Sequence, residues 1–174
     1  MKQLITIMLM LLCIATRGQK AIEATNEFLV TGAVTNELKF TLAAIERSPS
    51  GPIPDIVITN HKGEPRDTLK QLKGVLVKDL LKDIPLKEDN LKRFSEFYFT
   101  FVASDQYKVV YSWNEIFNSP TGNHIFIVTS INGEALQDMR SRILVVTPTD
   151  FKTGRRFIKC LSKVVVSRAE QEQP

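Results

Sequence analysis

Three cations near the end of the sequence are the residues best suited to bind a ligand. Arg155, Arg156 and Lys159 fall within five positions, and guanidinium and ammonium groups hold anions through charge-assisted hydrogen bonds. On a solvated strand edge, the same charges would serve only to prevent pairing with another chain. The spacing leaves both interpretations open, an anion site and a protected edge.

Two histidines and one cysteine are the candidate metal ligands beyond residue 18. His61 and His124 lie 63 positions apart, and with Cys160 they form no spacing typical of a metal site. We therefore predict no metal site. Both histidines are expected in solvated loops, and His61 also stays a candidate contact for a bound ligand.

Cys160 is the one thiol expected in the mature chain. Neighbouring cations such as Lys159 would lower its pKa and make it reactive. In a strand over residues 157–166, however, Cys160 shares a mostly apolar face with Ile158 and Val164. We expect Cys160 to be a buried, inert thiol.

Motifs of catalysis are missing from the sequence. There is no nucleophile elbow, Walker loop, dinucleotide-binding glycine pattern or His-Glu zinc helix. Asp105 is expected to support a turn through its own backbone, and Trp113 to anchor the core. We therefore predict no catalytic residue, although a triad assembled from distant positions stays open.

The first residues have the layout of a secretory signal. Lys2 precedes an apolar run over residues 4–15, and Gly18 supplies a small residue at the expected cleavage point. The run is shorter than the ~20 residues of a membrane-spanning helix. We predict a signal peptide at 1–18 and a mature protein at 19–174 that is periplasmic or secreted, without a membrane span.

The composition of the mature chain is that of an ordinary single domain. Acids and bases are interspersed, and loss of Lys2 and Arg17 lowers the net charge of +4 by two. A nucleic-acid-binding protein would show a clustered basic patch with aromatic side chains. We therefore exclude nucleic acid as a partner.

Apolar patterning predicts short strands and short helices in mixed order. The strands are expected at 27–34, 38–40, 55–60, 68–72, 97–103, 107–112, 125–129, 143–147 and 157–166, and the helices at 42–47, 76–84 and 113–117. Gly63 allows a hairpin turn at 61–64, and a second turn is expected at 104–106. This order is typical of a strand-rich α+β fold. The ordered core is expected at about 27–167, between flexible ends at 19–26 and 168–174.

Four segments carry a resemblance to a known family. They are the opening strand 28–34, residues 72–81 (similar to "tGvpLrdLL"), residues 102–107 (similar to "asDGY") and residues 154–159 (similar to "G-x-x-x-vKw"). In this order they resemble the oxidoreductase molybdopterin-binding domain, the fold of the catalytic domain of sulfite oxidases. The resemblance implies a mixed, layered β structure with a β-grasp-like part and small peripheral helices.

The resemblance also implies a cofactor. In that family a cysteine thiolate ligates molybdenum just before the "tGvpL" stretch, but residues 56–72 contain no cysteine. Nitrogen or oxygen is a poor substitute for a soft thiolate. The family binds its pterin phosphate near the closing strand. Carried over, this implies a shallow electropositive depression formed by Arg155, Arg156 and Lys159 near the 60–64 turn, with His61 and Asp105 as further ligand contacts.

Three functions follow in order of preference. The first is a non-catalytic or ligand-binding periplasmic protein with the sulfite-oxidase-like fold, whose partner is an anionic small molecule or another envelope protein. The second is a molybdenum-cofactor-dependent oxidoreductase with an unusual metal ligand. The third is a protein-interaction module of an exported assembly. The sequence identifies no cofactor beyond the molybdopterin that the resemblance implies.

Overall fold

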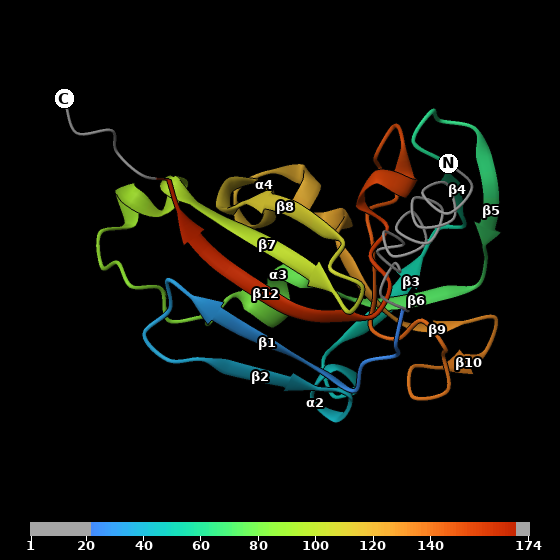
Figure 1. Cartoon of the computed structure of the whole chain (residues 1–174), viewed down its shortest axis with the longest axis horizontal. Coiled ribbons are helices and arrows are strands. Elements are labelled where there is room, and N and C mark those ends of the chain that lie inside the picture. Colours follow the sequence, from blue (N-terminus) through green and yellow to red (C-terminus); the bar gives the residue numbers. More distant parts are fainter. Residues whose placement is uncertain (1–21, 170–174) are drawn as a thin grey trace, which may run out of the picture.

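The computed structural model describes residues 22–169, which form an α+β fold of three β-sheets and short helices (Figure 1). The predicted fold class is confirmed. The signal peptide predicted at 1–18 lies outside the described residues. Among the described residues, no helix is long and apolar enough to cross a membrane.

The first sheet has β12 as its central strand, in the order β2-β1-β12-β7-β8. The bounds are β1 Glu27–Gly32, β2 Leu38–Thr41, β7 Phe97–Ala103, β8 Lys108–Ser112 and β12 Leu161–Arg168. β12 runs parallel to β1 and antiparallel to β7. Phe97, Phe99 and Phe101 on β7 are buried at alternate positions, so one face of this sheet is apolar.

The second sheet packs against that apolar face. Its strands have the order β10-β9-β6-β3, with β11 also paired to β9. The bounds are β3 Ser50–Ile53, β6 Leu72–Leu76, β9 Phe126–Ile131, β10 Glu134–Ala135 and β11 Leu144–Val146. Val75 and Ile127 of this sheet share one core cluster with Phe99 and Val164 of the first. Val128 belongs to a second cluster, because side chains of a strand alternate between the two faces of its sheet.

A separate hairpin of β4 Ile56–Thr59 and β5 Pro65–Leu69 stands at one end of the molecule (Figure 1). Its turn is closed by Asn60, whose Oδ1 accepts hydrogen bonds from the amides of Lys62, Gly63 and Glu64 at 2.9–3.0 Å. Gly63 has a φ of +100°, as the sequence predicted for this hairpin.

Within residues 22–169, six short helical segments connect the strands. The α-helices are α2 Leu42–Glu46, α3 Val77–Leu81 and α4 Trp113–Phe117, and the 3-10 helices are η1 Leu91–Glu96, η2 Pro120–His124 and η3 Thr153–Arg156. The hydroxyl of Thr41 accepts a hydrogen bond from the amide of Ala44 at 3.3 Å, which is the predicted cap of α2.

Two predicted strands are wrong in their bounds. The partner of β4 is Pro65–Leu69 rather than 68–72, and Leu72–Leu76 is β6 of the second sheet. The closing strand begins at Leu161 instead of residue 157, because residues 153–156 form a 3-10 turn and Cys160 has a φ of +55°. Arg155 and Arg156 therefore lie on a turn and not on a strand edge.

Candidate functional site

A depression of about 260 Å³ lies where the turn after β4, the β7–β8 hairpin and η3 meet. It is lined by Ile22, His61, Ala103, Asp105, Tyr107, Gly154, Phe157 and Lys159. The structure thus brings together three of the predicted ligand contacts, His61, Asp105 and Lys159. They come from segments that are far apart in the sequence.

The η3 segment is fixed to β4 by a close contact between main chains. The hydroxyl of Thr153 donates to the carbonyl of Val57 at 2.6 Å and accepts from the amide of Thr59 at 3.1 Å. A Cβ on Gly154 would lie 1.8 Å from the carbonyl oxygen of Thr59. Because glycine alone lacks that atom, the chain can hold η3 against the turn that follows β4.

Arg155 links the three walls of the depression. Its Nη2 donates to the carbonyl of His61 at 3.1 Å, and its own carbonyl accepts from the hydroxyl of Tyr107 at 2.6 Å. The side chain of Arg155 is exposed. This bond uses one N–H group of the guanidinium. The other N–H groups are therefore accessible to an anion.

The turn of the β7–β8 hairpin positions Asp105 and Tyr107. Asp105 Oδ1 accepts from the amide of Tyr107 at 2.9 Å, the predicted backbone support. The pKa of the Tyr107 hydroxyl is raised, mainly by burial; Arg155 opposes this rise and Asp105 adds to it. Tyr107 therefore stays neutral at ordinary pH, and its one hydroxyl proton is used in the hydrogen bond to the carbonyl of Arg155.

Lys159 supplies positive charge directly at the depression. Its side chain is exposed, and its Nζ lies 5.2 Å from the centre of the Phe157 ring. In residues 22–169, Lys159 forms no ion pair. Lys159 and Arg155 together outweigh Asp105, so the local charge favours an anion.

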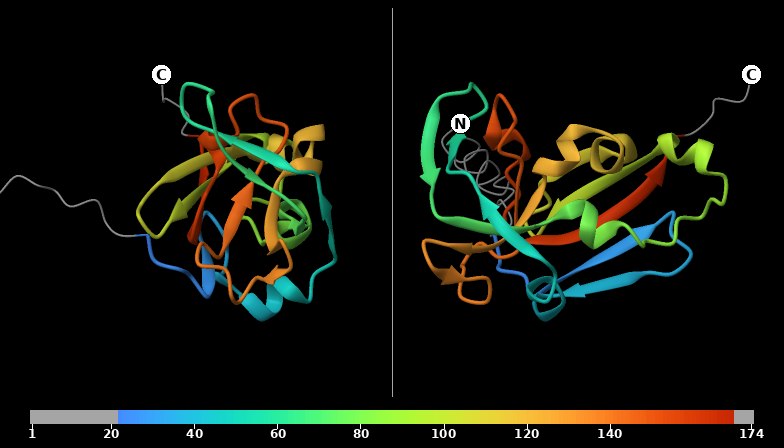
Figure 2. Two further views of the ribbon diagram at one scale, coloured as in Figure 1. Left: turned by 90° about the vertical axis from the view of Figure 1, so that its right-hand side faces the viewer. Right: turned by 180° about the vertical axis from the view of Figure 1, so that it is seen from behind.

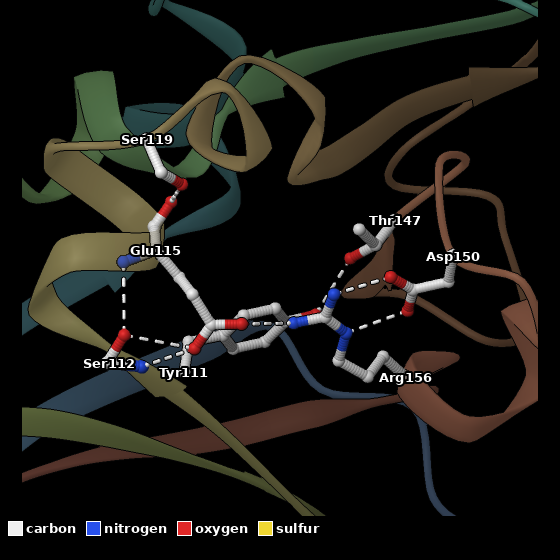
Figure 3. Close-up of polar contacts among 7 residues, drawn as sticks. All are labelled: Tyr111, Ser112, Glu115, Ser119, Thr147, Asp150 and Arg156. Carbon is white, nitrogen blue, oxygen red and sulfur yellow. Dashed lines mark hydrogen bonds and ion pairs between the residues drawn. The ribbon is translucent and has the colours of Figure 1, made fainter.

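Arg156, which the sequence grouped with these cations, does not line the depression. Figure 3 shows its guanidinium between two carboxylates: Nε lies 2.7 Å from Asp150 Oδ2, and Nη1 lies 2.9 Å from Glu115 Oε1. The guanidinium carbon also lies 4.7 Å above the centre of the Tyr111 ring. The hydrogen bond to Asp150 is the main cause that raises the pKa of Arg156. The positive charge of Arg156 is therefore balanced by Asp150 and Glu115 within the protein.

The same network continues into α4 and the core (Figure 3). Glu115 Oε2 accepts from the amide and hydroxyl of Ser112 at 2.9 and 3.0 Å, and that hydroxyl accepts from the Glu115 amide at 3.1 Å. This reciprocal pair is a capping box. The hydroxyls of Tyr111 and Thr147 are 2.8 Å apart, and burial is the main cause that raises the pKa of Tyr111.

Cys160 is fully buried, with an exposed fraction of 0%, as predicted. Its Sγ lies 3.9 Å from the carbonyl oxygen of Arg140. Burial raises the pKa of the thiol despite the nearby positive charge of Lys159, which acts in the opposite direction. Cys160 does not line the depression.

Five residues of the depression were not predicted as ligand contacts: Ile22, Ala103, Tyr107, Gly154 and Phe157. Ile22 falls in the segment 19–26, which was expected to be flexible. Within its described part, however, the amide of Glu23 donates to the Ser104 hydroxyl at 3.0 Å. The polar composition of residues 19–26 did not predict this contact with Ser104. The position of Phe157 could have been predicted from the sequence. Side chains alternate along extended chain, so Phe157 and Lys159 point to the side opposite Ile158.

Both histidines are exposed, and the structure does not bring them together with Cys160. His61 lies on the turn after β4 and His124 ends η2, whereas Cys160 is buried. Within residues 22–169, no group of three or more His, Cys, Asp or Glu side chains is arranged to hold a metal ion.

The sulfane dehydrogenase SoxCD from Paracoccus pantotrophus is a solved structure with a similar fold. The TM-score is 0.62 at 16% sequence identity, and the match covers 84% of this chain and 40% of that chain. The present chain thus spans about two fifths of the length of that protein chain. No protein-family model and no curated protein matches. The likeness supports the sulfite-oxidase-like fold that the sequence motifs implied.

Proposed function

We propose that the chain is an exported binding protein that uses the sulfite-oxidase-like fold to hold a small anion, without redox chemistry. One observation carries the proposal. The depression gathers Lys159 on its lining and Arg155 at its edge, where Arg155 is bonded to the carbonyl of His61. Cations around a concave surface favour an anionic ligand.

The molybdenum cofactor of the resembled family fits this depression poorly. The lining side chains offer nitrogen, oxygen and carbon atoms but no sulfur, whereas molybdenum in that family is held by a soft thiolate. The volume of about 260 Å³ is also below the ~300 Å³ at which pockets for drug-sized ligands begin. The dimensions suit a small anion better than a pterin.

Export is the second part of the proposal and rests on residues 1–18. The positive start and the apolar run before Gly18 are typical of a secretory signal. Mass spectrometry of protein taken from its native source tests this part. A mature chain beginning at Gln19 supports export, and an intact Met1 contradicts it.

Anion binding is tested with sulfate and phosphate as probes. Backbone amide shifts in nuclear magnetic resonance spectra should change at residues 61, 107 and 159 during titration. Lys159→Gln should weaken binding by about 5-fold, the effect of losing one exposed charge contact of ~1 kcal/mol. Lys163→Gln is the matched control, because Lys163 is also exposed but does not line the depression. Equal weakening by both variants would show only a general charge effect.

The oxidoreductase alternative is tested by elemental analysis. The mature protein is purified from a host that makes the molybdenum cofactor. We expect no stoichiometric molybdenum, because the depression offers no thiolate. One molybdenum atom per chain would overturn the proposal and identify the protein as a redox enzyme with an unusual ligand.

A further inference from the structure

A second cavity, of about 190 Å³, lies between α3, η1 and α4. Its lining consists of Leu81, Lys82, Ile84, Leu86, Phe94, Phe99, Trp113 and Phe117. It shares no residue with the depression described above. The helices α3 and α4 contact each other, and η1 contacts α4, so these three short segments lie side by side (Figure 2).

The walls of this cavity support one another. The ring centre of Trp113 lies 5.5 Å from that of Phe94 and 5.5 Å from that of Phe117. Phe117 in turn lies 5.9 Å from Phe99, which is 1% exposed. Edge-on and tilted contacts of this kind fix aromatic side chains. The cavity is therefore formed before any ligand enters.

The lining defines the chemistry of the ligand. Four aromatic and three aliphatic side chains surround the cavity, and Lys82 is the one charged residue among those that line it. Lys82 is exposed and makes no ion pair within residues 22–169. A matching ligand has an apolar ring for the aromatic walls and one negative group for the ammonium.

We propose that this cavity binds a small aromatic carboxylate. The volume of 190 Å³ is of the same order as the ~150 Å³ apolar cavity that accepts benzene. This size admits one ring with a short acidic chain. The ring supplies most of the affinity through apolar contact, and the exposed Lys82 adds the preference for an anion.

Trp113 makes the test direct, because the sequence contains one tryptophan. Intrinsic tryptophan fluorescence therefore reports on this cavity alone. Titration of the mature protein with phenylacetate should give a saturable change in emission. The neutral analogue 2-phenylethanol should bind about 2- to 5-fold more weakly, the range expected for one exposed charge contact. Lys82→Met should remove that difference.

Two further variants separate cavity binding from other effects. Ile84→Phe fills the cavity and should weaken phenylacetate binding at least tenfold, as measured by both fluorescence and calorimetry. Leu91→Ser is the control, because Leu91 is 75% exposed and does not line the cavity. Lys159→Gln should leave the affinity unchanged. The proposal is overturned by absence of saturable binding, by equal affinity for the neutral analogue, or by binding that Ile84→Phe leaves intact.

Discussion

The carbonyl oxygen of Thr59 occupies the place where any side chain on Gly154 would begin, 1.8 Å from the ideal Cβ position. Thr153, the preceding residue, bridges Val57 and Thr59 through its hydroxyl. These contacts hold η3 against β4. They set the position of the wall that carries Lys159.

Gly154→Ala should destabilise the protein by about 1–3 kcal/mol, the usual cost of forcing extra atoms into a packed site. Urea denaturation measures the free energy of unfolding. Gly51→Ala is the matched control, because a Cβ there meets no atom within 4 Å, and it should change stability by no more than about 0.5 kcal/mol. Equal losses in the two variants would refute the role of the Thr59 contact.

Gln106→Gly should stabilise the protein by roughly 0.5–1 kcal/mol. Gln106 has a φ of +73°, a left-handed conformation that costs ~1–2 kcal/mol in a residue with a Cβ. Part of this gain is offset by the greater freedom of glycine in the unfolded chain. Lys108→Gly, on the adjacent strand β8, should destabilise instead. A loss of stability in the Gln106 variant would contradict the strain argument.

Arg156→Ala should cost about 2–3 kcal/mol of stability, because it leaves the carboxylates of Asp150 and Glu115 without their partner in a half-buried site. Arg155→Ala should cost no more than about 0.5 kcal/mol, since that side chain is exposed. Chemical denaturation measures the free energy of unfolding of each of the two variants. Similar losses for both would show that Arg156 has no special structural role.

Tyr111 should make the protein less stable at alkaline pH. Burial is the main cause that raises the pKa of its hydroxyl in the folded state. Above the ordinary tyrosine pKa of about 10, the unfolded chain releases a proton that the folded chain keeps. The free energy of unfolding should therefore fall by up to about 1.4 kcal/mol per pH unit. Tyr111→Phe should flatten this slope in denaturation experiments from about pH 8 to 11. An unchanged slope would exclude Tyr111 as its source.

Cys160 should resist thiol reagents in the folded protein. Its side chain is fully buried, and burial raises the pKa of the thiol, so little thiolate is formed or accessible. Mass spectrometry should show labelling of the mature protein only after denaturant is added. Rapid stoichiometric labelling under native conditions would show that Lys159 and its neighbours activate the thiol.

Much of the fold could be predicted because local sequence determines local structure. Thr41 marks the start of α2, and Gly63 permits the turn after β4, as expected from their side chains. The stretch before α3 was harder, because residues 68–72 were expected to pair with β4 and residues 73–75 were assigned to no element, whereas Leu72–Leu76 forms β6. Periodicity alone does not separate a short buried strand from a helix.

The site was predictable only in part, for a different reason. Lys159, His61 and Asp105 meet at the depression as the motif order suggested. Arg156 does not join them, because its partners Asp150 and Glu115 are chosen by the tertiary arrangement. Three cations in five positions fix a local charge density, but not the direction in which each side chain points.

The central position of β12 in the first sheet has a consequence for the order of folding. β12 pairs with both β1 and β7, so the sheet stays split into two ribbons until residues 161–168 have been made. Pairings between segments so far apart along the chain form slowly. In a growing chain, the edges of β1 and β7 that face β12 therefore stay unpaired until β12 is made. For a protein that we propose is exported, we expect this late completion of the sheet to favour passage across a membrane before folding is complete.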